Sequence, residues 1–242
     1  ARCFAVFTTN KVKAAPVLYD KAALEHAHFA TAVVVNSGNA NACTGEQGYK
    51  DAERMATMTE EALGLTPKSV LVCSTGVIGH LMPMDKIEAG IPKLVEKLRT
   101  DASEEFGRAI LTTDLALKSH AVEIQTEKGV VTIGGACKGS GMIHPNMATM
   151  LAFITTDLGL PIDFFAEFRA NIADSFNAIT VDGDTSTNDT CILLANGMSG
   201  IKYEDLTLSE QGEFRAALTM IMQSLAKDIV RDGEGATKLI EL

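Results

Sequence analysis

The sequence predicts an α/β or α+β protein in which helices cover one side of at least one largely antiparallel sheet. Two observations support this fold class. Short apolar runs that suit buried strands interleave with segments whose apolar residues recur at helical spacing. One pair of alternating segments is separated by a glycine-containing turn, which is typical of an antiparallel hairpin. The length of 242 residues, with 46% hydrophobic and 21% charged residues, indicates one large globular domain, or one domain plus a fragment.

Each predicted strand is a short apolar or alternating run bounded by turn residues. These strands cover residues 4–7, 32–35, 70–73, 122–126, 131–133, 150–154, 192–195 and 238–242. The hairpin turns at Glu127-Lys128-Gly129, between the fourth and fifth of them. Because the first and last residues both have the pattern of strands, and the chain does not begin with Met, we expect it to be part of a longer protein.

Three helices are predicted by apolar residues that recur at intervals of three and four. They cover residues 52–63, 162–173 and 214–229. Pro161 suits the first turn of the second helix, and the third is expected to be capped by Ser209 and to end at Gly233. Residues 87–98 show the same stripe but contain Pro92, which cannot donate a hydrogen bond within a helix. That helix is therefore expected to begin near Pro92.

The charge balance argues against two classes of partner. The formal net charge is −10 and no run of Lys and Arg is present, so the chain is a poor candidate for binding nucleic acid or an anionic membrane surface. No apolar run approaches the roughly 20 residues needed to cross a bilayer, and the N-terminus lacks the pattern of a signal peptide. We therefore expect no nucleic acid and no membrane among its partners.

The cysteines and histidines do not form a metal-ligand pattern. The five cysteines are widely spaced, include no CxxC motif, and are interpreted as reduced, mostly buried side chains: Cys3, Cys43, Cys73, Cys137 and Cys191. Reduced cysteines favour a reducing compartment, so we expect a cytoplasmic protein. His26 and His28 form an isolated HxH pair, which is more typical of a protein surface than of a metal site.

Two polar loops follow predicted buried strands. Residues 36–45 and 74–79 are rich in Asn, Ser, Thr and Gly. A small polar loop at the end of a strand presents backbone N–H groups, which bind oxyanions or carboxylates. The alternative for each loop alone is an ordinary strand-to-helix turn.

Two further segments resemble known binding loops only in part. Residues 138–150 contain Gly139 and Gly141 around Ser140, but neither GxGxxG nor the Walker spacing is present, so a phosphate site is not favoured. Residues 182–189 carry alternating acids like a calcium loop, but Leu193 stands where the bidentate Glu is required. A hydrogen-bonded structural loop is the favoured interpretation of that segment.

In combination, these segments resemble the ArgJ family, the ornithine acetyltransferases and bifunctional glutamate N-acetyltransferases of arginine biosynthesis. The matching motifs run in family order from end to end: Phe7-Thr8-Thr9-Asn10, Ala14-Ala15-Pro16-Val17, residues 36–41, Ser74-Thr75-Gly76-Val77-Ile78-Gly79, Thr112-Thr113-Asp114, Lys138-Gly139-Ser140-Gly141-Met142, Met147-Ala148-Thr149-Met150-Leu151, Phe176-Asn177, Asp184-Thr185-Ser186-Thr187-Asn188-Asp189 and Asp232-Gly233-Glu234-Gly235.

The resemblance implies a layered sandwich of largely antiparallel sheets with helices outside, similar to that of the DmpA-like aminopeptidases. It also implies that residues 1–242 are the main domain, processed into an alpha chain, 1–148, and the start of a beta chain, 149–242. Family members continue beyond the position of Leu242, so the resemblance implies that a C-terminal region with further substrate contacts is missing.

The resemblance assigns roles to individual residues. The chain is expected to cut itself between Ala148 and Thr149, which makes the Thr149 hydroxyl a nucleophile beside its own α-amine. That amine, with an ordinary pKa of about 7.7–8.0, suits a general base. The family assigns the oxyanion hole to Thr75 and Gly76.

The substrate contacts implied by the family are Thr112, Lys138, Thr149 and Glu234. From the signs of the charges, Lys138 is expected to meet the substrate carboxylate and Glu234 the side-chain amine of the ornithine moiety. The alternatives are that Thr112 caps a turn or yields its role to Thr113, and that Lys138 and Glu234 are solvated surface charges.

The implied reaction is ping-pong transfer of an acetyl group from N2-acetylornithine to glutamate through an acetyl-threonine enzyme. No resident cofactor or metal is expected, although acetyl-CoA is a candidate co-substrate, and the family implies association of alpha and beta chains into a heterotetramer. Two other functions remain open at this point. One is an aminopeptidase or amidohydrolase with the same N-terminal nucleophile, and the other is an inactive fragment that binds a small molecule.

Overall fold

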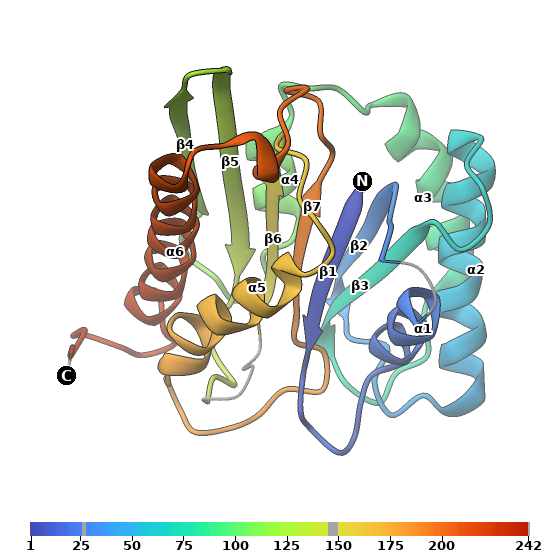
Figure 1. The fold of residues 1–242 in the computed structure, drawn as a ribbon. Coiled ribbons are helices and arrows are strands. Elements are labelled where there is room, and N and C mark those ends of the chain that lie inside the picture. Colours follow the sequence, from blue (N-terminus) through green and yellow to red (C-terminus); the bar gives the residue numbers. More distant parts are fainter. Residues whose placement is uncertain (26–27, 145–149, 242) are drawn as a thin grey trace.

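The computed structural model describes residues 1–25, 28–144 and 150–241 (Figure 1). Its larger sheet has five strands in the order β1-β7-β6-β5-β4, and its smaller sheet pairs β2 with β3. The strands are β1 (Arg2–Phe7), β2 (Ala32–Asn39), β3 (Val70–Val77), β4 (Lys118–Thr126), β5 (Gly129–Lys138), β6 (Leu151–Thr156) and β7 (Thr190–Ala195). The helices are α1 (Ala15–Leu24), α2 (Gly45–Leu63), α3 (Met84–Glu96), α4 (Ser103–Ala109), α5 (Phe164–Ala173) and α6 (Leu208–Arg231), with short 3-10 turns η1 (Phe176–Ala178) and η2 (Tyr203–Asp205).

The larger sheet is largely antiparallel, as predicted. Strand β1 pairs antiparallel with β7, and β5 pairs antiparallel with both β4 and β6, whereas β6 and β7 run parallel. The smaller sheet is parallel throughout, because β2 and β3 are connected through α2, which returns the chain to the starting edge. The sequence had not indicated this parallel pair.

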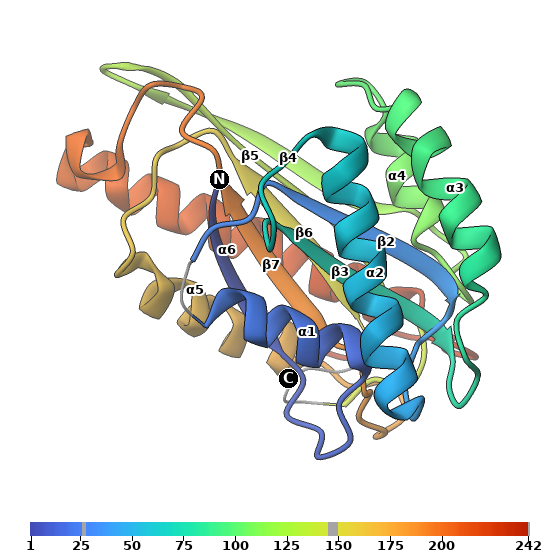
Figure 2. The ribbon, with the colours of Figure 1, turned by 90° about the vertical axis from the view of Figure 1, so that its right-hand side faces the viewer.

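The elements stack in four layers, as the two perpendicular views show (Figures 1 and 2). Helices α5 and α6 pack on one face of the larger sheet, the smaller sheet packs on its other face, and α1 and α2 cover the smaller sheet. Alternating residues of β6 separate the layers: Ala152 and Ile154 belong to the core beneath α6, while Leu151 and Phe153 face the smaller sheet. A strand buried on both faces is apolar without interruption, which explains the run in the sequence. The predicted layered sandwich with helices outside is confirmed.

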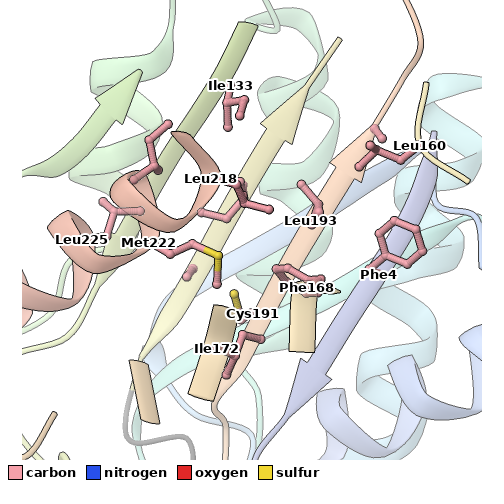
Figure 3. Close-up of a cluster of buried hydrophobic side chains, with 14 of the residues drawn as sticks. Phe4, Ile133, Leu160, Phe168, Ile172, Cys191, Leu193, Leu218, Met222 and Leu225 are labelled. Carbon is pink, nitrogen blue, oxygen red and sulfur yellow. The ribbon is translucent and has the colours of Figure 1, made fainter. Parts of the chain in front are cut away.

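The largest core lies between α6, α5 and the larger sheet (Figure 3). Leu218, Met222 and Leu225 of α6 meet strand residues such as Ile133 and Leu193, and all five are fully buried. Their spacing of three and four residues is the apolar stripe read from the sequence. Burying each such side chain stabilises the fold by about 1.5–3 kcal/mol, so this contact fixes α6 against the sheet.

Three local predictions are wrong. Helix α3 begins at Met84 and keeps Pro92 in its interior, because Glu88, whose carbonyl loses its partner, is exposed and can bond to water. Thr207, not Ser209, caps α6, because its hydroxyl accepts from Glu210 N while the Glu210 carboxylate accepts from Thr207 N. Residues 238–241 form no strand, since no neighbouring strand pairs with them among the described residues.

The cysteines behave as predicted. All five are free, and Cys3, Cys73, Cys137 and Cys191 are buried while Cys43 is exposed. Burial raises the pKa of the Cys3 thiol to about 12, so that side chain stays a neutral, apolar group. Over the described part of the chain, every helix is too short or too polar to span a bilayer.

The capping box of α6 gives a testable prediction. Thr207→Ala should lower the free energy of unfolding by about 0.5–2 kcal/mol, because the backbone N–H of Glu210 loses its hydroxyl acceptor. Ser209→Ala is the matched control, with an expected change within about 0.5 kcal/mol. Urea denaturation of the three proteins makes the comparison, and a larger loss in the Ser209 variant would contradict the assigned cap.

Candidate active site

Several polar segments meet at one end of the larger sheet. Lys138 at the end of β5 lies opposite Leu151 at the start of β6, which in turn lies opposite Thr190 at the start of β7. The end of β3 and the loop at residues 111–117 reach the same place, because their side chains bond to Lys138. Strand ends in this arrangement bring residues distant in sequence together without loss of sheet pairing.

Lys138 is the centre of this site. Its side chain is only 3% exposed, and its Nζ donates to Thr112 Oγ1 at 2.7 Å and to Thr75 Oγ1 at 3.3 Å. Three residues predicted from the resemblance, Thr75, Thr112 and Lys138, are therefore in direct contact. The alternative that Lys138 is a solvated surface charge is wrong.

Two aspartates and a second lysine lie behind Lys138. Asp114 Oδ1 is 2.8 Å from Lys118 Nζ, and its Oδ2 is 3.6 Å from Lys138 Nζ. Lys118 Nζ is also 2.5 Å from Asp232 Oδ2, just beyond the end of α6. The Asp114 carboxylate accepts further from Gly139 N at 2.6 Å. All four charged side chains are buried, so the group is a closed cluster of two positive and two negative charges.

The pKa values in this cluster follow from burial and pairing. Burial by itself would raise the pKa of Asp114, but the hydrogen bond from Lys118 and the charge of Lys138 outweigh it and hold that pKa below its ordinary value. Burial lowers the pKa of Lys138, and the charge of Asp114 opposes that shift. Burial alone would lower the pKa of Lys118, but the hydrogen bonds and charges of Asp114 and Asp232 outweigh it, so the pKa of Lys118 is raised.

Thr75 and Gly76 lie within a strand, not in a loop as predicted. The pairing of β2 with β3 continues past the apolar run, so that Ser37 lies opposite Thr75 and Gly38 opposite Gly76. Gly76 has φ +133°, and a Cβ there would stand 2.2 Å from the carbonyl carbon of Gly38. Only glycine fits both the conformation and the space. Gly76 is nevertheless exposed, so the backbone at this point is open to a ligand.

The segment after Lys138 packs against the residues that follow α6. The Ser140 carbonyl accepts from Glu234 N at 2.7 Å, and its hydroxyl bonds to Thr113 Oγ1 at 2.7 Å. The Glu234 carboxylate is exposed and lies over Gly141, where a Cβ would stand 2.7 Å from Oε2. Glu234 therefore reaches the same end of the sheet as Lys138.

The segment at residues 182–189 has a structural role at this end of the sheet. The Asp182 carboxylate accepts from Met142 N at 2.5 Å and from Ile143 N at 2.8 Å, which fixes the chain after Gly141. Asn188 Nδ2 donates to the carbonyls of Ala40 and Ser74, and so links this segment to both strands of the smaller sheet. Among the described residues, His, Cys, Asp and Glu side chains form no group of three or more suited to a metal ion.

Asp189 is a buried carboxyl group at the start of β7. Its side chain accepts from Met150 N at 3.0 Å, and its Oδ2 has no hydrogen-bond partner in the part of the chain that the structure describes. Burial raises the pKa of this carboxyl group, which the Met150 N–H opposes. Ala148 and Thr149, the predicted cleavage site and nucleophile, lie outside the described residues.

Four charged residues of the site were not predicted to have a role: Asp114, Lys118, Asp189 and Asp232. Three of them stand in the motifs quoted above, so the sequence did mark their positions. A motif does not show which of its charges are buried, and burial is what makes these four important here.

The comparisons with known proteins agree with this fold. The ArgJ family model matches residues 1–242. The arginine biosynthesis bifunctional protein ArgJ of Symbiobacterium thermophilum is 50% identical over 238 residues, which are 98% of this chain and 59% of that protein. The protein of the same description from Thermotoga neapolitana is 49% identical over 239 residues, again 98% of this chain and 60% of that one.

Two solved structures are also similar. A crystal structure of the bifunctional protein ArgJ from Bacillus halodurans is 42% identical, with a TM-score of 0.54 over 61% of this chain and 76% of that one. An ornithine acetyltransferase from Mycobacterium tuberculosis, complexed with ornithine, is 38% identical, with a TM-score of 0.53 over 59% of this chain and 77% of that one.

These matches place the protein among the α/β proteins with this layered fold, and more narrowly they show that the chain belongs to the ArgJ family. The chain spans about three fifths of the length of the curated relatives that it matches.

The buried cluster gives a stability prediction. Lys118→Met should lower the free energy of unfolding by about 3–5 kcal/mol at pH 7, because two buried carboxylates lose their shared cation. Asp114 has a lowered pKa, so it stabilises the fold above its unfolded pKa of about 3.9 and this contribution is lost as the pH falls below that value. The deficit of the variant should therefore shrink below about pH 4.

The matched control is Arg108→Met, which removes an exposed ion pair with Glu104. Its expected cost is below about 1 kcal/mol. Denaturant titrations from pH 3.5 to 8 measure both variants. Equal losses in the two would show that the cluster of Lys118 is no more important for stability than a surface pair.

Proposed function

We propose that the protein is an ornithine acetyltransferase that moves an acetyl group from N2-acetylornithine to glutamate. The observation that supports this most directly is the contact of Lys138 with Thr75 and Thr112 at the strand ends, beside the start of β6. These are three of the positions that the resemblance to the family assigns to catalysis and substrate binding. The relatives named above are called bifunctional ArgJ proteins, and one solved relative is an ornithine acetyltransferase with ornithine bound.

The proposed chemistry begins with scission of the chain between Ala148 and Thr149. The Thr149 hydroxyl then attacks the acetyl carbonyl carbon of acetylornithine and passes its proton to the new α-amine. Collapse of the tetrahedral intermediate breaks the C–N bond, and the amine returns the proton to the departing ornithine. The α-amino group of glutamate then attacks the acetyl ester in the same way. The ester C–O bond breaks, the Thr149 hydroxyl is restored, and N-acetylglutamate leaves. Met150, the next residue in the chain, is bonded to Asp189 at this end of the sheet.

The described residues suit the remaining roles in this scheme. Backbone N–H groups at Thr75 and Gly76 are the proposed donors to the oxyanion, where the glycine leaves the strand exposed. Lys138 is the proposed partner of the substrate carboxylate, and Thr112 is a proposed substrate contact beside it. Glu234, exposed and negative, is the proposed partner of the ornithine side-chain ammonium.

The scheme needs no resident cofactor or metal. Acetyl-CoA is a second possible donor, and the same assay tests it. We also propose that the alpha and beta chains assemble into a heterotetramer, which the size of the processed protein in solution tests.

Processing at Thr149 can be tested by mass. Intact mass spectrometry of the purified protein should show two chains separated between Ala148 and Thr149, and acetylornithine should add one acetyl group to the chain that begins with Thr149. Thr149→Ala should give one unprocessed chain with no acetyl adduct. Thr155→Ala, an exposed threonine on β6, is the matched control and should process normally. An intact parent chain with full activity would contradict the mechanism.

Product analysis in the same experiment separates transfer from hydrolysis. With glutamate present, formation of N-acetylglutamate without excess acetate indicates a transferase. Acetate release that is indifferent to glutamate indicates an amidohydrolase, and calorimetric binding of acetylornithine without an acetyl adduct indicates a binding fragment.

Gly76 allows a test of the proposed oxyanion hole. Gly76→Ala should lower kcat by roughly 10²–10³-fold, because a methyl group there would displace the backbone donors from the carbonyl oxygen. Gly79→Ala is the matched control, because Gly79 also has a positive φ, +85°, but its Cβ would meet no atom within 4 Å. Steady-state kinetics together with thermal unfolding compare the two. An equal fall in kcat for both variants would argue against a hole at Gly76.

A further inference from the structure

We propose that Asp114 is a positioning residue, whose buried carboxylate keeps the Lys138 ammonium charged and in place beside Thr75 and Thr112, so that Lys138 can bind an anionic group of the substrate. The role of Lys138 as a substrate contact rests on the proposed function. The pairing of Asp114 with Lys138 does not, because it follows from the geometry of the described residues.

The Asp114 carboxylate is held from two sides. Its Oδ1 accepts from Lys118 Nζ at 2.8 Å and from Gly139 N at 2.6 Å, and its Oδ2 accepts from Thr112 N at 3.2 Å and lies 3.6 Å from Lys138 Nζ. Because the Gly139 N–H belongs to the residue after Lys138, the same carboxylate fixes both the backbone and the charge of Lys138. The Asp114 side chain is 0% exposed, so water does not screen the interaction.

Lys138 depends on this carboxylate more than on its other neighbours. Thr75 and Thr112 only supply hydroxyl groups, and burial favours the neutral amine. Three charged groups shift the pKa of Lys138. Asp114 has the largest effect and raises it, Lys118 lowers it, and Asp189 raises it. Among the described residues, Asp114 is the carboxylate within 4 Å of its Nζ.

Asp232 provides a comparison within the same cluster. It is bonded to Lys118 Nζ and accepts from the backbone N–H groups of Leu115 and Ala116, but no ion pair joins it to Lys138 among the described residues. Loss of either aspartate removes one carboxylate partner from the buried Lys118. Only the loss of Asp114 takes the partner from Lys138.

The test compares Asp114→Asn with Asp232→Asn in protein labelled with ¹³C at lysine Cε. The Cε chemical shift reports the titration of each lysine, and Lys138→Arg assigns the Lys138 signal. In Asp114→Asn the midpoint of Lys138 should fall by at least about 1 pH unit, since an opposite charge at this distance is typically worth about 1–3 units. In Asp232→Asn the midpoint of Lys138 should stay close to that of the parent, while that of Lys118 falls.

A second variant covers the case in which Asp114→Asn does not fold. Asp114→Asn combined with Lys118→Met leaves one positive and one negative charge in the cluster, whereas Asp114→Asn alone leaves two positive charges and one negative charge, so the double variant is expected to fold better. The attraction of Asp114 for Lys138 exceeds the repulsion from Lys118, so the Lys138 midpoint should fall in this double variant too. An unchanged Lys138 midpoint in the folded variant, or an equal fall in Asp232→Asn, would overturn the proposal.

Kinetics link the pairing to the substrate. In Asp114→Asn, KM for acetylornithine should begin to rise at a lower pH than in the parent, at the lowered Lys138 midpoint, and should rise by on the order of tenfold or more above it, as Lys138 loses its proton and with it a charged hydrogen bond. Asp232→Asn should lack this shift to lower pH, and its presence in both variants would count against a specific role of Asp114. If the Lys138 midpoint falls but no variant or parent transfers acetyl groups, the proposed function fails while the role of Asp114 stands.

Discussion

The Asp114 carboxylate is a shared acceptor for several parts of the chain at the end of the larger sheet where the site lies. It binds Lys118 at the start of β4 and the backbone at the end of β5, and through Lys118 it reaches Asp232 beyond the end of α6. Removing these charges from water is costly, and the structure offsets that cost by pairing each one within about 4 Å of an opposite charge. The charged cluster behind the site is therefore polar but shielded from water, and its geometry depends on all of these partners together.

The layered fold explains why such a site can exist at this end. The larger sheet is covered by α5 and α6 on one face and by the smaller sheet on the other, so its central strands β6 and β7 are apolar along most of their length. Polar groups gather where the strands end, and Lys138, Thr75 and Asp189 all lie within a residue or two of a strand terminus. In a water-poor environment, hydrogen bonds and charges act more strongly on a bound substrate than they do in bulk water.

Much of the fold was readable from local patterns. Seven of the eight predicted strands and the helices predicted at 52–63, 162–173 and 214–229 lie near their predicted places, because each buries a periodic apolar face, as the stripe of Leu218, Met222 and Leu225 shows. The errors came from features that local patterns do not contain. Pro92 is tolerated because Glu88 is exposed, and the cap of α6 is Thr207 because Glu210 completes the box there rather than at Ser209.

The residue types and their order along the chain were enough to identify the family and to predict Thr75, Thr112, Lys138 and Glu234 as site residues. They did not show that Lys138 is buried against Thr75, or that Asp114, Asp189 and Asp232 carry buried charges beside it. Those properties depend on which strand ends meet, and Lys138 and Thr75, 63 residues apart in sequence, meet because the two sheets pack face to face. Sequence records chemistry at each position, whereas the dielectric surroundings and the partners of each charge are set by the packing of the whole chain.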